Sequence, residues 1–297
     1  MKNSYLRLHF VVFIWGFTAI LGDLISQEAM SLVWNRMGLA VAVLFVYVAF
    51  KKINLKISYS NLATFIFAGV VIAAHWVTFF HAIKISNVSV TLACLSSGAF
   101  FTSLLEPIFL KKKFIAYEMI LGLLVVVGIA TIFTVESQYK WGILTALTSA
   151  FLSALFSVIN GVAVKNNSAT VITIYELFGG WLALTLFFIF NGDLDLSLLP
   201  TEGNDLIYIL ILAVVCTAYP FIESVRIMKE LSPFTVVLTI NLEPVYGIIM
   251  AFFLLGEDEK MSGGFYLGAL IILFTVFANA YIKKRGLPFL KRTNIES

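Results

Sequence analysis

The chain has 297 residues, of which 60% are hydrophobic and only 12% are charged, and its mean hydropathy is +0.97. Because a soluble globular domain carries about 25% charged residues, this composition excludes an ordinary soluble protein and predicts an all-α integral membrane protein. The two cysteines, Cys94 and Cys216, lie in apolar runs and indicate neither a disulfide framework nor a metal site. We therefore expect no cofactor and no bound metal.

Ten apolar runs follow one another along the chain. Each has roughly 20 residues, enough for a helix to cross the hydrocarbon layer. The longest predicted loop, Asn191–Asp205, has 15 residues, which leaves no room for a soluble domain between the runs. We predict ten transmembrane helices at 6–25, 32–50, 62–83, 88–109, 114–134, 141–164, 171–190, 206–227, 233–255 and 263–282.

The pattern of one helix pair occurs twice, 146 residues apart. Ile85–Phe133 and Leu231–Lys284 share a small-residue start, a long span, a charged turn and a glycine-containing span. This similarity predicts a duplication into two five-helix repeats, residues 1–137 and 138–297. Because five spans are an odd number, the two repeats must insert in opposite senses, an arrangement typical of secondary transporters.

Lys and Arg residues predict the orientation. With the N-terminus in the cytoplasm, sixteen of them fall on the inside and three on the outside, Lys84, Lys140 and Lys260. Positive charge gathers on the cytoplasmic side of membrane proteins, so we expect both termini there and a location in the cell (cytoplasmic) membrane. The matched turns agree, since Lys111-Lys112-Lys113 faces inside and Glu257-Asp258-Glu259 faces outside.

Several short motifs resemble those of the drug/metabolite transporter superfamily, specifically its EamA-type family. They are Phe13-Ile14-Trp15-Gly16-Phe17-Thr18, Arg36 in the second span, Leu231-Ser232-Pro233, Leu242-Glu243-Pro244, Leu254-Leu255-Gly256-Glu257 and Leu267-Gly268. The first half departs from the pattern, with Ser97-Gly98 where the second half has Glu243-Pro244. The resemblance implies export of metabolites or amino acids through a cavity formed mainly by spans three, four, eight and nine.

Glu243-Pro244 is the sharpest local signal in the spans. Pro244 has no N–H, so it leaves the carbonyl of Ile240 without its helical donor and kinks the helix. A glutamate beside such a break can bind a proton or a substrate amine. The alternative is a structural glutamate that braces the kink.

The eighth span has a polar face made by Cys216, Tyr219, Glu223 and Arg226 at three- and four-residue steps. One interpretation is a structural pair between Glu223 and Arg226. The interpretation that we favour places this face on a water-filled cavity, where the two charges bind the two ends of a zwitterion.

The remaining candidates lie in other spans. His75 is near mid-span and can titrate, although a lone histidine is commonly a packing residue. Trp15 and Trp76 are deep enough to form a cation–π or stacking wall. Asn241 and Ser97 are groups that line pores or pack helices tightly, and packing is the more common case.

A second group of ionisable residues falls nearer the predicted span ends. For these we expect snorkelling or interfacial anchoring. Arg36 is the exception, because the resemblance also indicates it. The others are Asp23, His81, Glu106, Glu118, Glu176 and Arg226.

The sequence thus predicts a secondary transporter that moves a small organic solute, a metabolite or an amino-acid-like molecule, by alternating access. Proton-coupled export is one form, and a facilitative uniporter or exchanger without proton coupling is the alternative. An intramembrane enzyme or receptor is the rival class, but the sequence has none of the common enzyme motifs, so we expect no enzymatic activity. The expected partners are the substrate, the lipid bilayer and protons, with no nucleic acid, in a monomer or homodimer.

Overall fold

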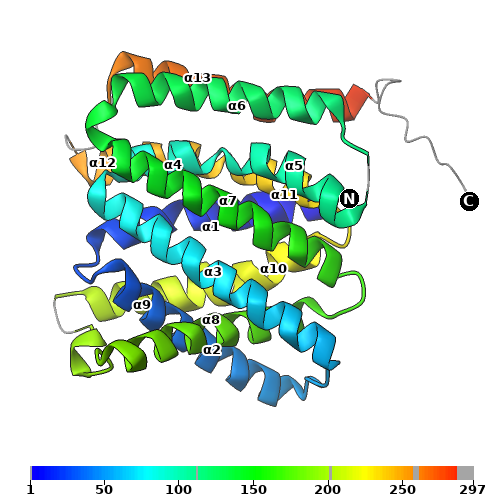
Figure 1. Ribbon diagram of the computed structural model, residues 1–297, viewed down its shortest axis with the longest axis vertical. Coiled ribbons are helices and arrows are strands. Elements are labelled where there is room, and N and C mark those ends of the chain that lie inside the picture. Colours follow the sequence, from blue (N-terminus) through cyan, green and yellow to red (C-terminus); the bar gives the residue numbers. More distant parts are fainter. Residues whose placement is uncertain (1, 112, 201–202, 257–260, 286–297) are drawn as a thin grey trace, which may run out of the picture.

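The computed structural model describes residues 2–111, 113–200, 203–256 and 261–285, and this part of the chain contains helices and no strand. Figure 1 shows the helices stacked in successive layers, with α6 and α13 at one edge and α2 and α8 at the other. The α-helices are α1 (Lys2–Leu24), α2 (Ala29–Lys51), α3 (Tyr59–Ile85), α4 (Val88–Leu95), α5 (Gly98–Leu110), α6 (Ala116–Val135), α7 (Lys140–Ala163), α8 (Ala169–Asn191), α9 (Asp205–Ala213), α10 (Tyr219–Ile227), α11 (Pro233–Ile240), α12 (Glu243–Leu254) and α13 (Gly263–Arg285). Short helical segments are η1 (Ser137–Tyr139), η2 (Leu196–Leu198) and the π-helical η3 (Val214–Ala218).

These helices confirm the predicted all-helical membrane fold. Nine helical segments of the described chain are long and apolar enough to cross a membrane, and Gly263–Asn279 within α13 is a further, shorter apolar helix. Each predicted span matches one helix or a run of two or three consecutive helical segments, to within four residues at both ends. The acidic turn Glu257-Asp258-Glu259 lies outside the described residues, as does the end of the chain after Arg285.

Two spans are broken at corresponding places in the two repeats. The fourth span divides into α4 and α5 at Ser96–Ser97, and the ninth divides into α11 and α12 at Asn241–Leu242. Their first helices also begin alike, because the side chains of Asn87 and Ser232 each accept a hydrogen bond from the backbone N–H three residues on. Such N-caps satisfy donors that the first helical turn leaves free.

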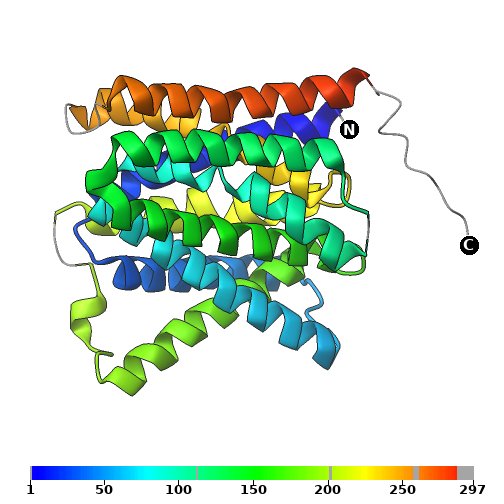
Figure 2. The ribbon, with the colours of Figure 1, turned by 45° about the horizontal axis from the view of Figure 1, so that its top comes forward.

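The packing partners show that the repeats are inverted. The first part of the fourth span, α4, packs against α12, the second part of the ninth, while α5 packs against α11. The two matched spans therefore run antiparallel. The matched pairs α6 with α13 and α2 with α8 also pack together, so each of these spans lies beside its own counterpart. Figure 2 shows α6 and α13 running alongside each other from the turned view.

Glycines allow the closest of these contacts. An ideal Cβ on Gly128 of α6 would lie 2.8 Å from the carbonyl oxygen of Gly268 in α13, and one on Gly268 would lie 2.6 Å from that of Gly128. Such approaches are too short for any side chain. Small residues at crossing points are the usual means by which membrane helices pack, since no water is present to drive them together.

Candidate functional site

A cavity lies between helices of both repeats. Its lining comes from α1, α2, α3, α4, α7, α10, α11 and α12, and it holds about 670 Å³ of space not filled by atoms, part of it open to the outside. Aromatic rings, including those of Trp15, Trp76, Phe79, Phe156 and Phe221, supply much of the wall. The polar part of the lining includes Thr18, Arg36, His75, Asn160, Ser224 and Glu243.

Arg36 is the cation of this cavity and is 1% exposed. Its Nε donates a hydrogen bond of 2.7 Å to Thr217 Oγ1, and its Cζ lies 4.1 Å from the centroid of the Trp76 ring. Its Nη1 atom has no hydrogen-bond partner among the described residues. A buried guanidinium with a free N–H group is suited to bind a carboxylate or another anionic oxygen.

The π-helical segment η3 holds this arginine in place. Thr217 Oγ1 accepts from Arg36 and donates to the carbonyl of Leu212, 2.7 Å away and five residues earlier. The carbonyl of Cys216 accepts a hydrogen bond of 3.1 Å from Trp15 Nε1. One π-helical turn therefore orients two side chains of the first repeat, and such turns occur frequently at functional sites.

Glu243 is the acidic group of the cavity and is 5% exposed. It is the first residue of α12, directly after the break of the ninth span, and it interacts electrostatically with Arg36. Ile240, whose carbonyl cannot receive an N–H from Pro244, also lines the cavity. The cavity thus combines a cation with a carboxyl group that lies at a break in the helix.

Most of the other sequence candidates lie in or beside this cavity. His75 lines it, and its Nδ1 contacts both the hydroxyl and the carbonyl oxygen of Ser149, at 2.8 and 2.9 Å. Trp15 and Trp76 line it as well. Asn241 lies instead at an apolar pocket between α4, α12 and α13. Ser97 is buried and donates to the carbonyl of Cys94, 2.8 Å away, as part of the helix break.

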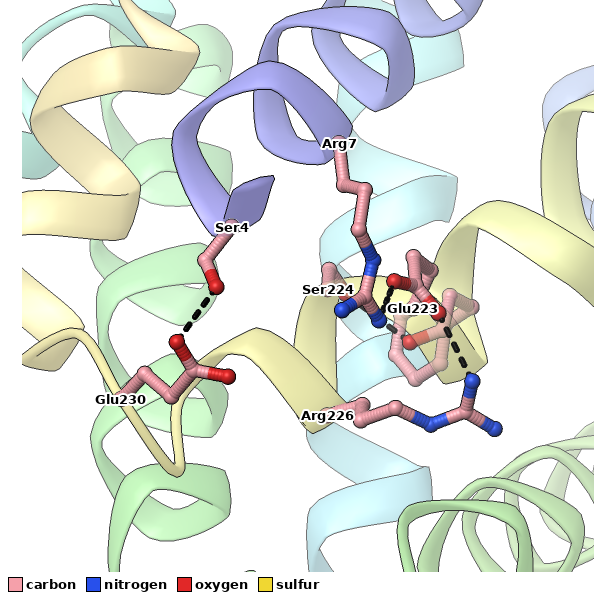
Figure 3. A network of polar contacts seen from close by, with 7 residues as sticks. Ser4, Arg7, Glu223, Ser224, Arg226 and Glu230 are labelled. Carbon is pink, nitrogen blue, oxygen red and sulfur yellow. Dashed lines mark hydrogen bonds and ion pairs between the residues drawn. The ribbon is translucent and has the colours of Figure 1, made fainter. Parts of the chain in front are cut away.

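Glu223 and Tyr219 do not line the cavity. The Glu223 side chain is 3% exposed and forms ion pairs with Arg7 of α1 and, at 3.0 Å, with Arg226 (Figure 3). Tyr219 is 50% exposed and is not part of the cavity lining. The paired arrangement of Glu223, one of the two sequence interpretations, is therefore the one present here, with an additional arginine more than 200 residues away in the chain.

Next to this ion-pair cluster, Ser4 connects α1 to the loop after α10. Its hydroxyl donates a hydrogen bond of 2.6 Å to the carboxylate of Glu230 (Figure 3). This bond holds the pKa of Glu230 below its ordinary value. The start of α1 is thus held to the end of α10 and the loop after it by five polar residues: Ser4, Arg7, Glu223, Arg226 and Glu230.

The expectation of interfacial anchoring is wrong for three glutamates, Glu106, Glu118 and Glu176, which are buried with exposures of 8%, 8% and 0%. Glu106 Oε2 accepts a hydrogen bond of 2.8 Å from the backbone N–H of Phe234 in α11, and Glu176 lies inside α8. Asn160 Nδ2, from the cavity wall, donates to its Oε2 at 3.3 Å. No local pattern in the sequence indicates that Asn160 and Glu176, which are 16 residues apart, lie together.

In the described part of the chain, no group of three or more His, Cys, Asp or Glu side chains is placed to hold a metal ion. Two inverted helical repeats around a central cavity are an arrangement found in membrane transporters. The chain belongs to the EamA-like transporter family, whose model matches it twice, over residues 4–134 and 140–281. The resemblance to the drug/metabolite transporters is thereby confirmed, and the family is one of transporters of small solutes, not of enzymes.

A comparison with solved structures supports the fold. A solved structure titled "Crystal structure of protein" shares 13% sequence identity with this chain at a TM-score of 0.73, covering 97% of this chain and 99% of that one. At that identity the likeness shows the fold alone. No curated protein matches the sequence.

Proposed function

We propose that this protein is a secondary transporter that moves a small zwitterionic organic solute, such as an amino acid or a related metabolite, by alternating access. The observation that carries the proposal is a buried guanidinium and a buried carboxyl group, those of Arg36 and Glu243, in one cavity to which both repeats contribute. Arg36 retains a free N–H group for a carboxylate, and Glu243 is available to an ammonium group.

The aromatic wall supports a solute with an organic side chain. Trp76 already stacks on Arg36, and Trp76 and Phe156 each lie within 6 Å of Phe221 by ring centroids. Aromatic rings bury apolar carbon well and keep the charged groups of the solute away from competing water. The same wall would disfavour a fully hydrated inorganic ion.

The helix breaks support alternating access. The fourth and ninth spans are each divided next to the cavity, at Ser96–Ser97 and Asn241–Leu242. Discontinuous helices at the interface between inverted repeats can pivot at the break while the flanking helices stay packed. The contact between Arg7 and Glu223 lies at the end of the bundle that the sequence predicts to be cytoplasmic. Such a contact would then form in one state and separate in the other.

The test is counterflow in proteoliposomes, in which unlabelled pools of amino acids and metabolites are loaded inside and labelled solutes are added outside. Saturable exchange of a zwitterion, lost in both Arg36→Gln and Glu243→Gln, is the expected result. Exchange that survives both substitutions in folded protein would overturn the proposed site. Repeating the flux with an imposed pH gradient separates proton-coupled export, the form we propose, from a facilitator or exchanger.

A further inference from the structure

A carboxyl group behind the cavity wall carries a second inference. Glu176 is 0% exposed in α8, and an ionised carboxylate in a membrane interior is costly unless charges or several hydrogen bonds compensate it. Within the described residues its side chain has one hydrogen bond, which Asn160 Nδ2 donates to Oε2 over a long 3.3 Å, and its Oε1 has no partner. The environment of this group does not suit a negative charge.

The unsatisfied atoms of the pair show what is missing. Asn160 Oδ1 is also buried and has no partner in the part of the chain that the structure describes. An ionised glutamate can only accept, so Glu176 Oε1 and Asn160 Oδ1 both need a donor that the pair cannot supply. A proton on Oε1 turns the carboxyl into a donor, and an acid facing a primary amide can then give and receive one hydrogen bond each. A single proton would therefore satisfy both oxygens.

The surrounding helices offer no other compensation. An ideal Cβ on Gly69 of α3 would lie 2.1 Å from the carbonyl oxygen of Glu176, so the α3 and α8 backbones are in direct contact here. None of the charged or imidazole groups on the helices packed against α8 pairs with Glu176 in the described chain. These groups are Arg36 and Lys51 on α2, His75, His81 and Lys84 on α3, and Glu223 and Arg226 on α10; α7, which supplies Asn160, carries Lys140 at its first residue.

Asn160 connects this carboxyl to the cavity, because it lines the cavity and also donates to Glu176. We propose that Glu176 and Asn160 form a proton-binding site that couples proton movement to solute movement. The inference rests on the proposed transport function. A solute that hydrogen-bonds to Asn160 would draw the Asn160 N–H away from Glu176. The proton affinity of Glu176 would then change, so that the acid releases its proton to one side of the membrane and regains a proton from the other.

The first experiment reads the proton directly and does not depend on transport. Infrared difference spectroscopy of the purified full chain in lipid at neutral pH should show the carbonyl band of a protonated carboxyl group. Glu176→Gln should remove this band while keeping the shape and donor of the acid, and the exposed Glu28→Gln should leave it unchanged. A band that persists unchanged in folded Glu176→Gln would overturn the proposal.

Two further measurements keep the proposal falsifiable. If Glu176→Gln fails to fold, Asn160→Ala should shift the same band to higher frequency, because the acid loses its hydrogen bond; an unshifted band refutes the pairing. In proteoliposomes, Glu176→Gln should still exchange solute while its flux becomes the same with and without a pH gradient. Full gradient dependence in that variant would refute coupling, whereas absence of any wild-type flux would refute the transport function and leave the spectroscopic result standing.

Discussion

Replacing Arg36 by lysine tests the cavity most directly, because the change keeps the positive charge and removes the planar guanidinium. The wild-type group donates to Thr217 at 2.7 Å, stacks 4.1 Å from Trp76 and leaves one N–H group free. A lysine ammonium has a single charged atom and cannot make the Thr217 bond, the stacking contact and a solute contact together.

The expected loss follows from one charged hydrogen bond to the solute. Such a bond is worth about 1.5–3 kcal/mol, which corresponds to roughly ten- to 150-fold weaker binding. The assay is equilibrium binding of the solute identified by counterflow to purified protein. Arg226→Lys is the matched control, because its partner Glu223 lies outside the cavity lining and the solute affinity should not change. Wild-type affinity in folded Arg36→Lys would refute the assignment of Arg36 to solute binding.

Three predictions concern stability and are read by thermal unfolding in detergent. Glu223→Gln should lower the free energy of unfolding by about 1–2 kcal/mol, a value between those for buried and surface ion pairs, because the glutamate is buried and its arginine partners are partly exposed. An unchanged unfolding temperature would contradict this. Gly69→Ala should lower the free energy of unfolding by about 1–3 kcal/mol, because the methyl group of the new alanine meets the α8 backbone. An unchanged stability would mean that α3 and α8 separate freely. Ser4→Ala should raise the lowered pKa of Glu230. The stability from that carboxylate is present above its unfolded pKa and disappears as the pH falls through its folded pKa. Wild type should therefore be more stable than Ser4→Ala at neutral pH and equally stable in acid. A stability difference that does not change with pH would be inconsistent with this.

The spans could be predicted because the hydrocarbon layer fixes both the length and the apolarity of a crossing helix. The break before Pro244 was visible for a covalent reason, the missing N–H. The matching break at Ser96–Ser97 carries no proline, and only its position in the repeat indicates it. Nothing in Val214–Ala218 signals a π-helix, since these residues also suit an α-helix.

The site was predictable in part for a related reason. Sequence position gives the depth of a side chain in the bilayer, whereas packing decides whether it meets lipid, a cavity or another helix. Glu176 has an end-of-span position and is nevertheless completely buried, because α8 packs tightly on α3. Glu223 lies on the polar face that the helical period indicated, and its pairing with Arg7 depends on a contact that no local pattern contains.

The π-helical turn η3 allows the eighth span to hold one residue more than a regular helix of the same rotation. An α-helix advances about 100° per residue, and the wider turn absorbs the additional residue, so α10 keeps its orientation relative to α9. Inserting one more residue directly after η3 would rotate α10 by about 100°, because no wider turn is left to absorb it. Phe221 and Ser224 would then turn away from the cavity, and Glu223 would lose its place opposite Arg7. Deleting Val215, in contrast, would allow a regular helix with α10 in its present orientation, so this span should tolerate a residue lost at η3 better than a residue gained after it.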